Sequence, residues 1–383
     1  MLKNKSLISL LFSNFAITLI GLITGLILAK FTSLEVRGEV GKILVWVTFG
    51  INLITLGTIE YYYSGGVNKR LVIDKIIYFI VGGFLIFSIS MFFHFNNLKE
   101  YIYYILFLVP MNLYSLYKIS ELNLCGYLAR LSVVKVIQPF SYLIILLVLI
   151  FYKKLNVDYI LWANIISNFI LILFLFLIPK LDIEKSNKIN FNTEWLLVNF
   201  SSFLGVIVSN FDKIYITYKY NLEDIALYLV GLTIVGAPIG IIGQTYATKF
   251  IYGKTNEESY LKNVFVYIGV TSLVCCLIYF ISPFLLKFLF GDKYNGILNI
   301  ILAIIFLSFL VNFRLILTRI LRNLGRNKVI LKSELLLVIG AIFILLLSFL
   351  NFMSSISSFI SIYAIMFFVN ILYLLSIFKG IIK

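Results

Sequence analysis

The chain has 383 residues, of which 61% are hydrophobic and 13% are charged, and its mean hydropathy is +1.03. This composition excludes an ordinary soluble globular protein and indicates an integral membrane protein with several spans. The formal net charge is +15, but the basic residues are scattered over short connections. Because no basic domain could hold a nucleic acid, contact with anionic membrane lipid is the favoured reason for this charge.

Long runs without charged residues predict twelve membrane-spanning helices, because a helix of about 20 apolar residues crosses the bilayer core. The first run is followed by further spans and lacks a cleavage site, so it is not a signal peptide. The expected spans cover residues 7–29, 43–59, 76–94, 101–117, 131–152, 159–178, 195–215, 225–248, 263–286, 296–318, 329–350 and 355–378. The sequence therefore predicts an all-α integral membrane protein.

A polar connection near the middle predicts two six-helix bundles, formed by residues 1–179 and 195–383 and joined by a cytoplasmic linker at 180–194. The halves share short sequences at equivalent places: Asn14-Phe15 recurs as Asn199-Phe200. Two halves of six helices have the same orientation and would be related by an axis along the membrane normal. Lys and Arg are about twice as frequent in the connections on the side of the termini, which predicts cytoplasmic termini.

The sequence offers few residues for catalysis or metal binding. Cys125, Cys275 and Cys276 lie in or beside apolar runs, and His94, the single histidine, lies at the end of a span. This pattern predicts neither disulfides nor a metal cluster. No glycine-rich phosphate loop is present, so direct use of ATP is not expected. We expect a protein that is not an enzyme and has no cofactor.

Polar residues follow one face of the predicted seventh span. Asn199, Ser202, Gly205 and Ser209 recur at intervals of three and four residues, which places them on one side of a helix. The first span has a matching face of Asn14, Thr18, Gly21 and Gly25. Amide and hydroxyl groups on matching helices suit the walls of a cavity that holds sugars. The alternative is close helix packing through small residues.

Arg314 is a cation inside the predicted tenth span. A guanidinium at this depth costs about 2.5–3.5 kcal/mol on insertion scales. The positions three and four residues away hold no carboxylate, so the side chain needs a partner on another helix or a hydrated cavity. We interpret it as a ligand for an anionic substrate group. The alternative is an arginine that extends to the inner membrane surface.

Charged residues at the ends of spans are further candidates. Lys30 and Lys213 close the first and seventh spans on the outer side, where each could bind phosphate or anchor its helix. Asp212 precedes Lys213, and adjacent helical residues point in different directions. The two are therefore not expected to pair, which leaves Asp212 for another helix or a coupling cation. Glu60 ends the second span beside three tyrosines, which suit sugar stacking or an interfacial belt.

The predicted eighth span contains Gly236, Gly240, Gly243 and Pro238. Glycine and proline in a helix predict a bend or close packing. A bend at this place could act as a hinge.

Four short motifs occur at regular places along the chain. They are GEV at 38–40 after the first span, NFDK at 210–213 in the seventh, LFGDKY at 289–294 after the ninth and RNLGRN at 322–327 after the tenth. Their order and spacing resemble the motifs of the O-antigen and polysaccharide-unit flippases, a family of the multidrug/oligosaccharidyl-lipid/polysaccharide exporter (MOP) superfamily. The resemblance implies a turn at the first of these motifs and another at the last. The first motif departs from the family, because Val40 stands where an aromatic residue is usual.

The resemblance implies two bundles around a central cavity in the bacterial inner membrane. It implies that an undecaprenyl-diphosphate-linked oligosaccharide repeat unit passes to the outer leaflet by alternating access, for O-antigen or capsule assembly. A polymerase and a chain-length regulator are implied as partners. Two alternatives stay open. An ion-coupled multidrug antiporter of the same fold would favour an acidic cavity, and a membrane polysaccharide polymerase or ligase commonly carries a large outer loop.

Overall fold

The computed structural model describes residues 2–55, 101–124, 127–178, 193–252, 257–353 and 355–382. Within these ranges the chain forms helices joined by turns, without strands. The described residues up to 178 belong to one compact unit, and those from 193 onward belong to a second. The expected third span at 76–94 and nearly all of the expected linker lie outside the described residues. The same holds for three residues named above, Glu60, His94 and Cys125.

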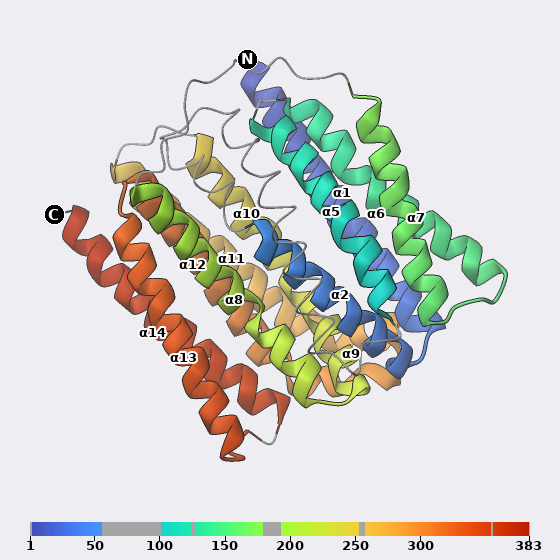
Figure 1. The fold of residues 1–383 in the computed structure, drawn as a ribbon. Coiled ribbons are helices and arrows are strands. Elements are labelled where there is room, and N and C mark those ends of the chain that lie inside the picture. Colours follow the sequence, from blue (N-terminus) through green and yellow to red (C-terminus); the bar gives the residue numbers. More distant parts are fainter. Residues whose placement is uncertain are drawn as a thin grey trace. The chain divides into compact units, whose positions relative to one another are not determined.

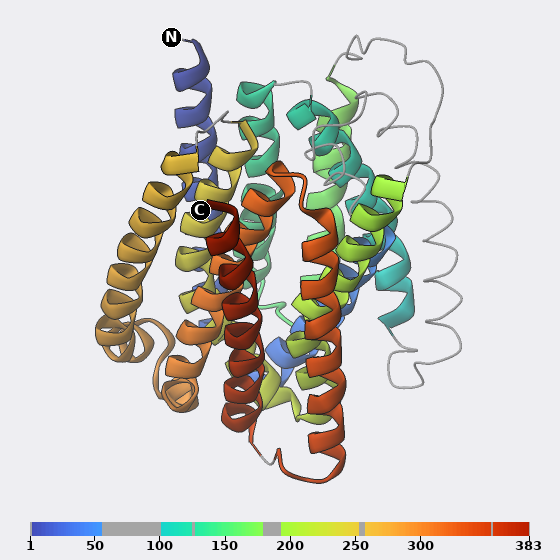
Figure 2. The same cartoon turned by 90° about the vertical axis from the view of Figure 1, so that its left-hand side faces the viewer.

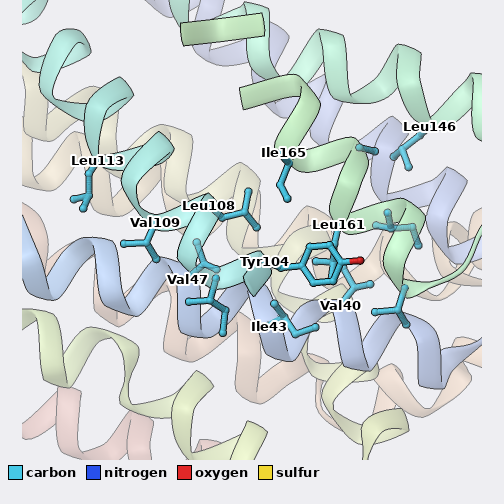
Figure 3. Packing of buried hydrophobic residues seen from close by; sticks show 14 residues of the cluster. Val40, Ile43, Val47, Tyr104, Leu108, Val109, Leu113, Leu146, Leu161 and Ile165 are labelled. Atoms are coloured by element: carbon cyan, nitrogen blue, oxygen red, sulfur yellow. The ribbon is translucent and has the colours of Figure 1, made fainter. Parts of the chain in front are cut away.

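The N-terminal unit contains helices α1, α2, α5, α6 and α7 in its described part (Figure 1). Their bounds are Leu2–Phe31, Leu34–Thr55, Ile102–Leu124, Leu128–Phe151 and Val157–Phe176, in that order. Helix α6 packs along α1 and α7, while α5 packs against α7 and α2. Figure 3 shows the hydrophobic cluster that these contacts form around Tyr104. The hydroxyl of this tyrosine donates a 2.8 Å hydrogen bond to Asp158 at the start of α7.

The C-terminal unit contains seven α-helices and three shorter elements among the described residues. The α-helices are α8 (Thr193–Lys219), α9 (Leu222–Gly231), α10 (Ala237–Tyr252), α11 (Glu257–Leu285), α12 (Ile301–Asn323), α13 (Asn327–Phe349) and α14 (Ile356–Ile382). Two π-helical turns, η2 (Leu232–Gly236) and η3 (Leu286–Phe290), and a 3₁₀ helix, η4 (Asp292–Asn299), lie between them. Helix α12 packs against α10, α11, α13 and α14. Figure 2 shows α13 and α14 running side by side.

Local side chains and backbone geometry set several helix ends. Asn156 and Asn221 cap α7 and α9 by accepting backbone N–H groups with their side-chain oxygens. Gly325 follows α12 with φ of 70°, and the N–H of Arg326 reaches back to the carbonyl of Leu321. A left-handed residue with this bond is a common end of an α-helix. The RNLGRN motif therefore contains the expected turn.

The GEV motif lies within a helix rather than in the expected turn. Helix α2 begins at Leu34, so residues 38–40 belong to its second turn. The hydroxyl of Ser33 accepts the backbone N–H of Val36 at 3.3 Å, which starts the helix ahead of the apolar run. The sequence predicts a later start for this helix, because charged residues lie in the first two turns of α2 and the apolar run begins only after them.

Nine segments among the described residues are long and apolar enough to cross a membrane. They coincide with nine of the twelve expected spans. The expected second and seventh spans also form helices, α2 and α8, which are not among these nine segments. The protein is therefore a multi-pass membrane protein by its helices, and the count of twelve stays a prediction.

The expected eighth span is a helix interrupted by the π-helical turn η2, which joins α9 to α10. A Cβ atom at Gly231 would lie 2.6 Å from Ile304 of α12, so glycine permits the close contact there. Gly243 likewise faces Asn312 of α12. The segment formed by α9, η2 and α10 therefore packs closely on α12, and its helical geometry changes at η2.

Candidate functional site

Arg314 lies inside the C-terminal unit on α12, with 8% of its surface exposed. Its guanidinium forms an ion pair with Glu334 of α13. Its Nε atom donates a 3.0 Å hydrogen bond to the side-chain oxygen of Asn370 on α14, and its Cζ atom lies 5.8 Å from the ring centroid of Phe367. The arginine is therefore paired on neighbouring helices and does not extend to a surface.

Asn370 connects the ion pair to a second buried residue of α13. Its side-chain oxygen also accepts the hydroxyl of Ser333 at 2.9 Å, and its Nδ2 atom donates to the backbone carbonyl of Ser333 at 2.8 Å. The side-chain amide of Asn370 thus both accepts and donates hydrogen bonds. Because a buried polar group costs free energy unless it is hydrogen-bonded, these contacts hold α12, α13 and α14 in one arrangement.

Arg322 extends the network by two helical turns along the same face of α12. Its side chain is buried, and its Nη2 atom donates a 3.2 Å hydrogen bond to the hydroxyl of Ser202 on α8. The sequence had placed Arg322 in a cytoplasmic connection, because the tenth span was expected to end at residue 318. The helix continues to Asn323, so Arg322 belongs to the helix packing.

Helix α8 makes room for this network with a glycine. A Cβ atom at Gly205 would lie 3.2 Å from a carboxylate oxygen of Glu334, which is closer than side chains usually approach. Asn199 and Ser202 of the expected polar face are buried, whereas Ser209 is exposed and donates to the carbonyl of Val206. Ser202 and Gly205 of this face therefore lie against side chains of α12 and α13, and its role as a cavity wall stays a prediction.

Asp212 lies further along α8 and is 4% exposed. Its carboxylate accepts the hydroxyl of Tyr228 on α9. It also lies 3.7 Å from the ammonium of Lys213, so the expectation that these neighbours would not pair is wrong. The long lysine side chain bends back along the helix, where its Nζ atom also donates to the carbonyl of Ser209 at 3.3 Å.

The N-terminal candidates do not form a common cluster within the described residues. Asn14 and Thr18 are half-buried on α1, and the hydroxyl of Thr18 donates to the carbonyl of Asn14 at 3.0 Å. Lys30 is exposed at the end of α1, with its ammonium 5.9 Å from the ring centroid of Phe31. Glu60 lies outside the described residues. Their role in binding stays a prediction.

Sequence reasoning missed Glu334, Asn370 and Ser333, which contact Arg314 or its partners. The first two carried a signal, because Glu334 falls inside the expected eleventh span and Asn370 inside the twelfth. An ionisable or amide side chain at membrane depth indicates an internal partner. No carboxylate lies three or four residues from Arg314 on its own helix, so its partner comes from another helix.

The network therefore joins buried guanidinium, carboxylate, amide and hydroxyl groups of α8, α12, α13 and α14. In the part of the chain that the structure describes, no cluster of His, Cys, Asp or Glu could hold a metal ion. The thiols of Cys275 and Cys276 are free.

No protein-family model matches the sequence, and no curated protein matches it. Solved structures do match the fold. The MATE multidrug transporter DinF-BH is similar over 98% of this chain and 94% of that one, with a TM-score of 0.65 and 14% identity. An outward-facing multidrug resistance MATE family transporter of the MOP superfamily covers 98% and 96%, with a TM-score of 0.62 and 13% identity.

A third similar structure is a MOP superfamily transporter from Pyrococcus furiosus, for which reverse polarity of the binding pocket suggests a different function. It is similar over 99% of this chain and 96% of that one, with a TM-score of 0.61 and 14% identity. At these identities the similarity shows the fold. The chain has the fold of MOP superfamily transporters, and these similar structures are transporters rather than enzymes.

Proposed function

We propose that the protein is a flippase that moves undecaprenyl-diphosphate-linked oligosaccharide repeat units from the cytoplasmic to the outer leaflet by alternating access. The transporter fold supports the general activity, and the four sequence motifs support this particular cargo. Placement in a bacterial inner membrane with cytoplasmic termini belongs to the same proposal. A polymerase and a chain-length regulator are the proposed protein partners.

The observation that carries the proposal is the buried face of α12, on which Arg314 and Arg322 lie two turns apart. A sugar diphosphate is an anion, and the planar guanidinium fits phosphate oxygens in pairs. A cationic drug would meet like charge at this place. Glu334 offsets part of the positive charge, so we expect an anionic cargo to compete with this carboxylate for Arg314.

The second candidate is an ion-coupled multidrug antiporter. The similar structures with a named cargo class are multidrug transporters, so the comparisons support this candidate more directly than they support the flippase. Asp212 adds a specific observation, because a buried carboxylate beside a tyrosine hydroxyl suits a coupling cation. The two candidates share the fold and differ in the charge of the cargo.

One reconstitution tests both candidates. The full-length protein is placed in liposomes that contain a fluorescent undecaprenyl-diphosphate-linked sugar, and a membrane-impermeant quencher reports the fraction in the outer leaflet. Parallel liposomes contain a fluorescent cationic dye and carry a proton or sodium gradient. Quenching beyond that of protein-free liposomes supports the flippase. Gradient-driven dye movement without lipid flipping would replace it with the antiporter.

A further inference from the structure

A second polar cluster lies in the N-terminal unit, where α6 packs on α7. The Nε2 atom of Gln138 on α6 donates to the hydroxyl of Ser167 on α7 at 3.3 Å. Asn168 is 1% exposed, and its Nδ2 atom donates to the side-chain oxygen of Asn164 at 2.8 Å. The amide of Gln138 and the hydroxyl of Ser167 therefore lie in this helix interface, and the Asn164–Asn168 pair lies close to Ser167 along α7.

Lys135 lies on α6 about one turn before Gln138. It is half-buried and makes no hydrogen bond or ion pair with any residue in the part of the chain that the structure describes. Another half-buried lysine of this unit, Lys118, forms a 2.8 Å ion pair with Glu121 on its own helix. The described residues therefore offset the charge of Lys118 but not the charge of Lys135.

The contacts of neighbouring residues place Lys135 beside the polar cluster. Leu131, one turn earlier, packs in a hydrophobic cluster that includes Leu171 of α7. Gln138, about one turn later, contacts Ser167 of the same helix. Positions 131, 135 and 138 follow the spacing of one helix face. Lys135 therefore lies on the α7 side of α6, between an apolar contact and an amide contact.

The position of Lys135 along the helix makes its charge costly. Residues 129–151 are apolar enough to cross a membrane, and Lys135 lies about 10 Å along α6 from its first residue at a rise of about 1.5 Å per residue. An ammonium withdrawn from water without a partner loses hydration free energy. An anion from outside the protein would offset this cost.

We propose that Lys135 and the adjacent amide cluster bind the phosphate group of a membrane lipid. Lysine binds phosphate as a point charge, and amide N–H groups add hydrogen bonds. Exposed apolar side chains of α6, among them Val133 and Phe140, suit a lipid chain better than a soluble anion. The phosphate belongs either to the polyprenyl diphosphate of the cargo or to an anionic phospholipid, and the first source rests on the proposed function.

Lipid binding by the full-length protein tests this site. The protein is embedded in phosphatidylcholine nanodiscs and titrated with undecaprenyl diphosphate or, in a separate arm, phosphatidylglycerol. Lys135→Gln should weaken binding of at least one lipid by about tenfold or more, the loss expected for a charged hydrogen bond. Lys135→Arg should keep most of the affinity. Lys328→Gln removes an exposed lysine at the start of α13 and should change neither arm.

Thermal unfolding separates this role from a structural one. Without added lipid, Lys135→Gln should unfold at the same or a higher temperature than the native protein, because it removes a desolvated charge. Added lipid should then stabilise the native protein more than the variant. A lower unfolding temperature without lipid, together with unchanged affinity, would identify a structural lysine and overturn the site.

The two arms also separate this inference from the proposed function. Lys135-dependent binding of phosphatidylglycerol alone supports a phosphate site for a bulk lipid, and Lys135-dependent binding of undecaprenyl diphosphate supports a cargo site even where no flipping occurs. Equal binding by Lys135→Gln and Lys328→Gln overturns the inference. It leaves the flippase proposal intact if the native protein flips the labelled lipid.

Discussion

The ion pair between Arg314 and Glu334 permits a quantitative test of how the C-terminal unit is stabilised. Arg314→Gln and Glu334→Gln each remove one charge and leave its partner buried. Two unit charges about 4 Å apart interact by about 4 kcal/mol at an effective dielectric constant of about 20. Breaking a buried pair typically costs about 3–5 kcal/mol, because the remaining charge is uncompensated.

The double variant should lose less stability than the sum of the two single losses. Gln at both positions leaves no charge, and the two amides can hydrogen-bond to each other and to Asn370. We expect each single variant to lose about 3–5 kcal/mol and the double variant to recover about 2–3 kcal/mol of the summed loss, within the range of coupling energies of contacting residues. At about 2–4 °C per kcal/mol, each single loss corresponds to about 10 °C.

Thermal unfolding of the purified protein in one detergent measures all four proteins of this double-mutant cycle. Single losses that simply add in the double variant would refute a direct interaction. Losses below about 0.5 kcal/mol would place both side chains in a hydrated setting. Transport by the double variant then separates stability from function. If Arg314 binds the diphosphate, the double variant should fail to flip lipid at temperatures well below its measured unfolding temperature, where it is folded.

Two further predictions follow from single contacts, and a third concerns the topology. Gly205→Val should destabilise by about 1–3 kcal/mol in thermal unfolding, because its side chain overlaps Glu334, and this penalty should be smaller when Gly205→Val is introduced into the Glu334→Ala background; full stability of the single variant would contradict the packing. Tyr228→Phe should cost about 1.5–3 kcal/mol because Asp212 loses a hydrogen bond, and the penalty should shrink in the Asp212→Asn background rather than stay constant. A cysteine at Asn295, in a protein without its native cysteines, should react with an impermeant maleimide in intact cells, whereas reaction only after permeabilisation would reverse the topology.

Several features of the candidate site were accessible from the sequence. Arg314 was identified because a cation in an apolar run is unusual at any depth. The small and polar face of the seventh span was identified from its spacing, and its residues Asn199 and Ser202 are buried. In each case the signal is local, since it depends on residue type and on helical periodicity within one helix.

The partners of these residues were not accessible in the same way. Glu334 and Asn370 lie on helices that follow α12 in the chain, and their contact with Arg314 depends on how three helices pack. The pairing of Asp212 with Lys213 was misjudged for a related reason. The direction of the Cα–Cβ bond predicts the side on which a side chain leaves the helix. A long lysine side chain can nevertheless bend so that its ammonium lies against its own helix.

The sequence by itself determined the class of molecule, the places of most helices and the presence of a cation at membrane depth, because hydropathy and periodicity act along the chain over about 20 residues. Tertiary structure decided that this cation is paired, that Arg322 belongs to the packed helix and that Lys135 is not paired by the described part of the chain. The physical reason is that the free energy of a buried charge depends on groups brought within a few ångströms from distant helices. The pattern of residues along one helix does not specify the distance between its charged group and groups on other helices.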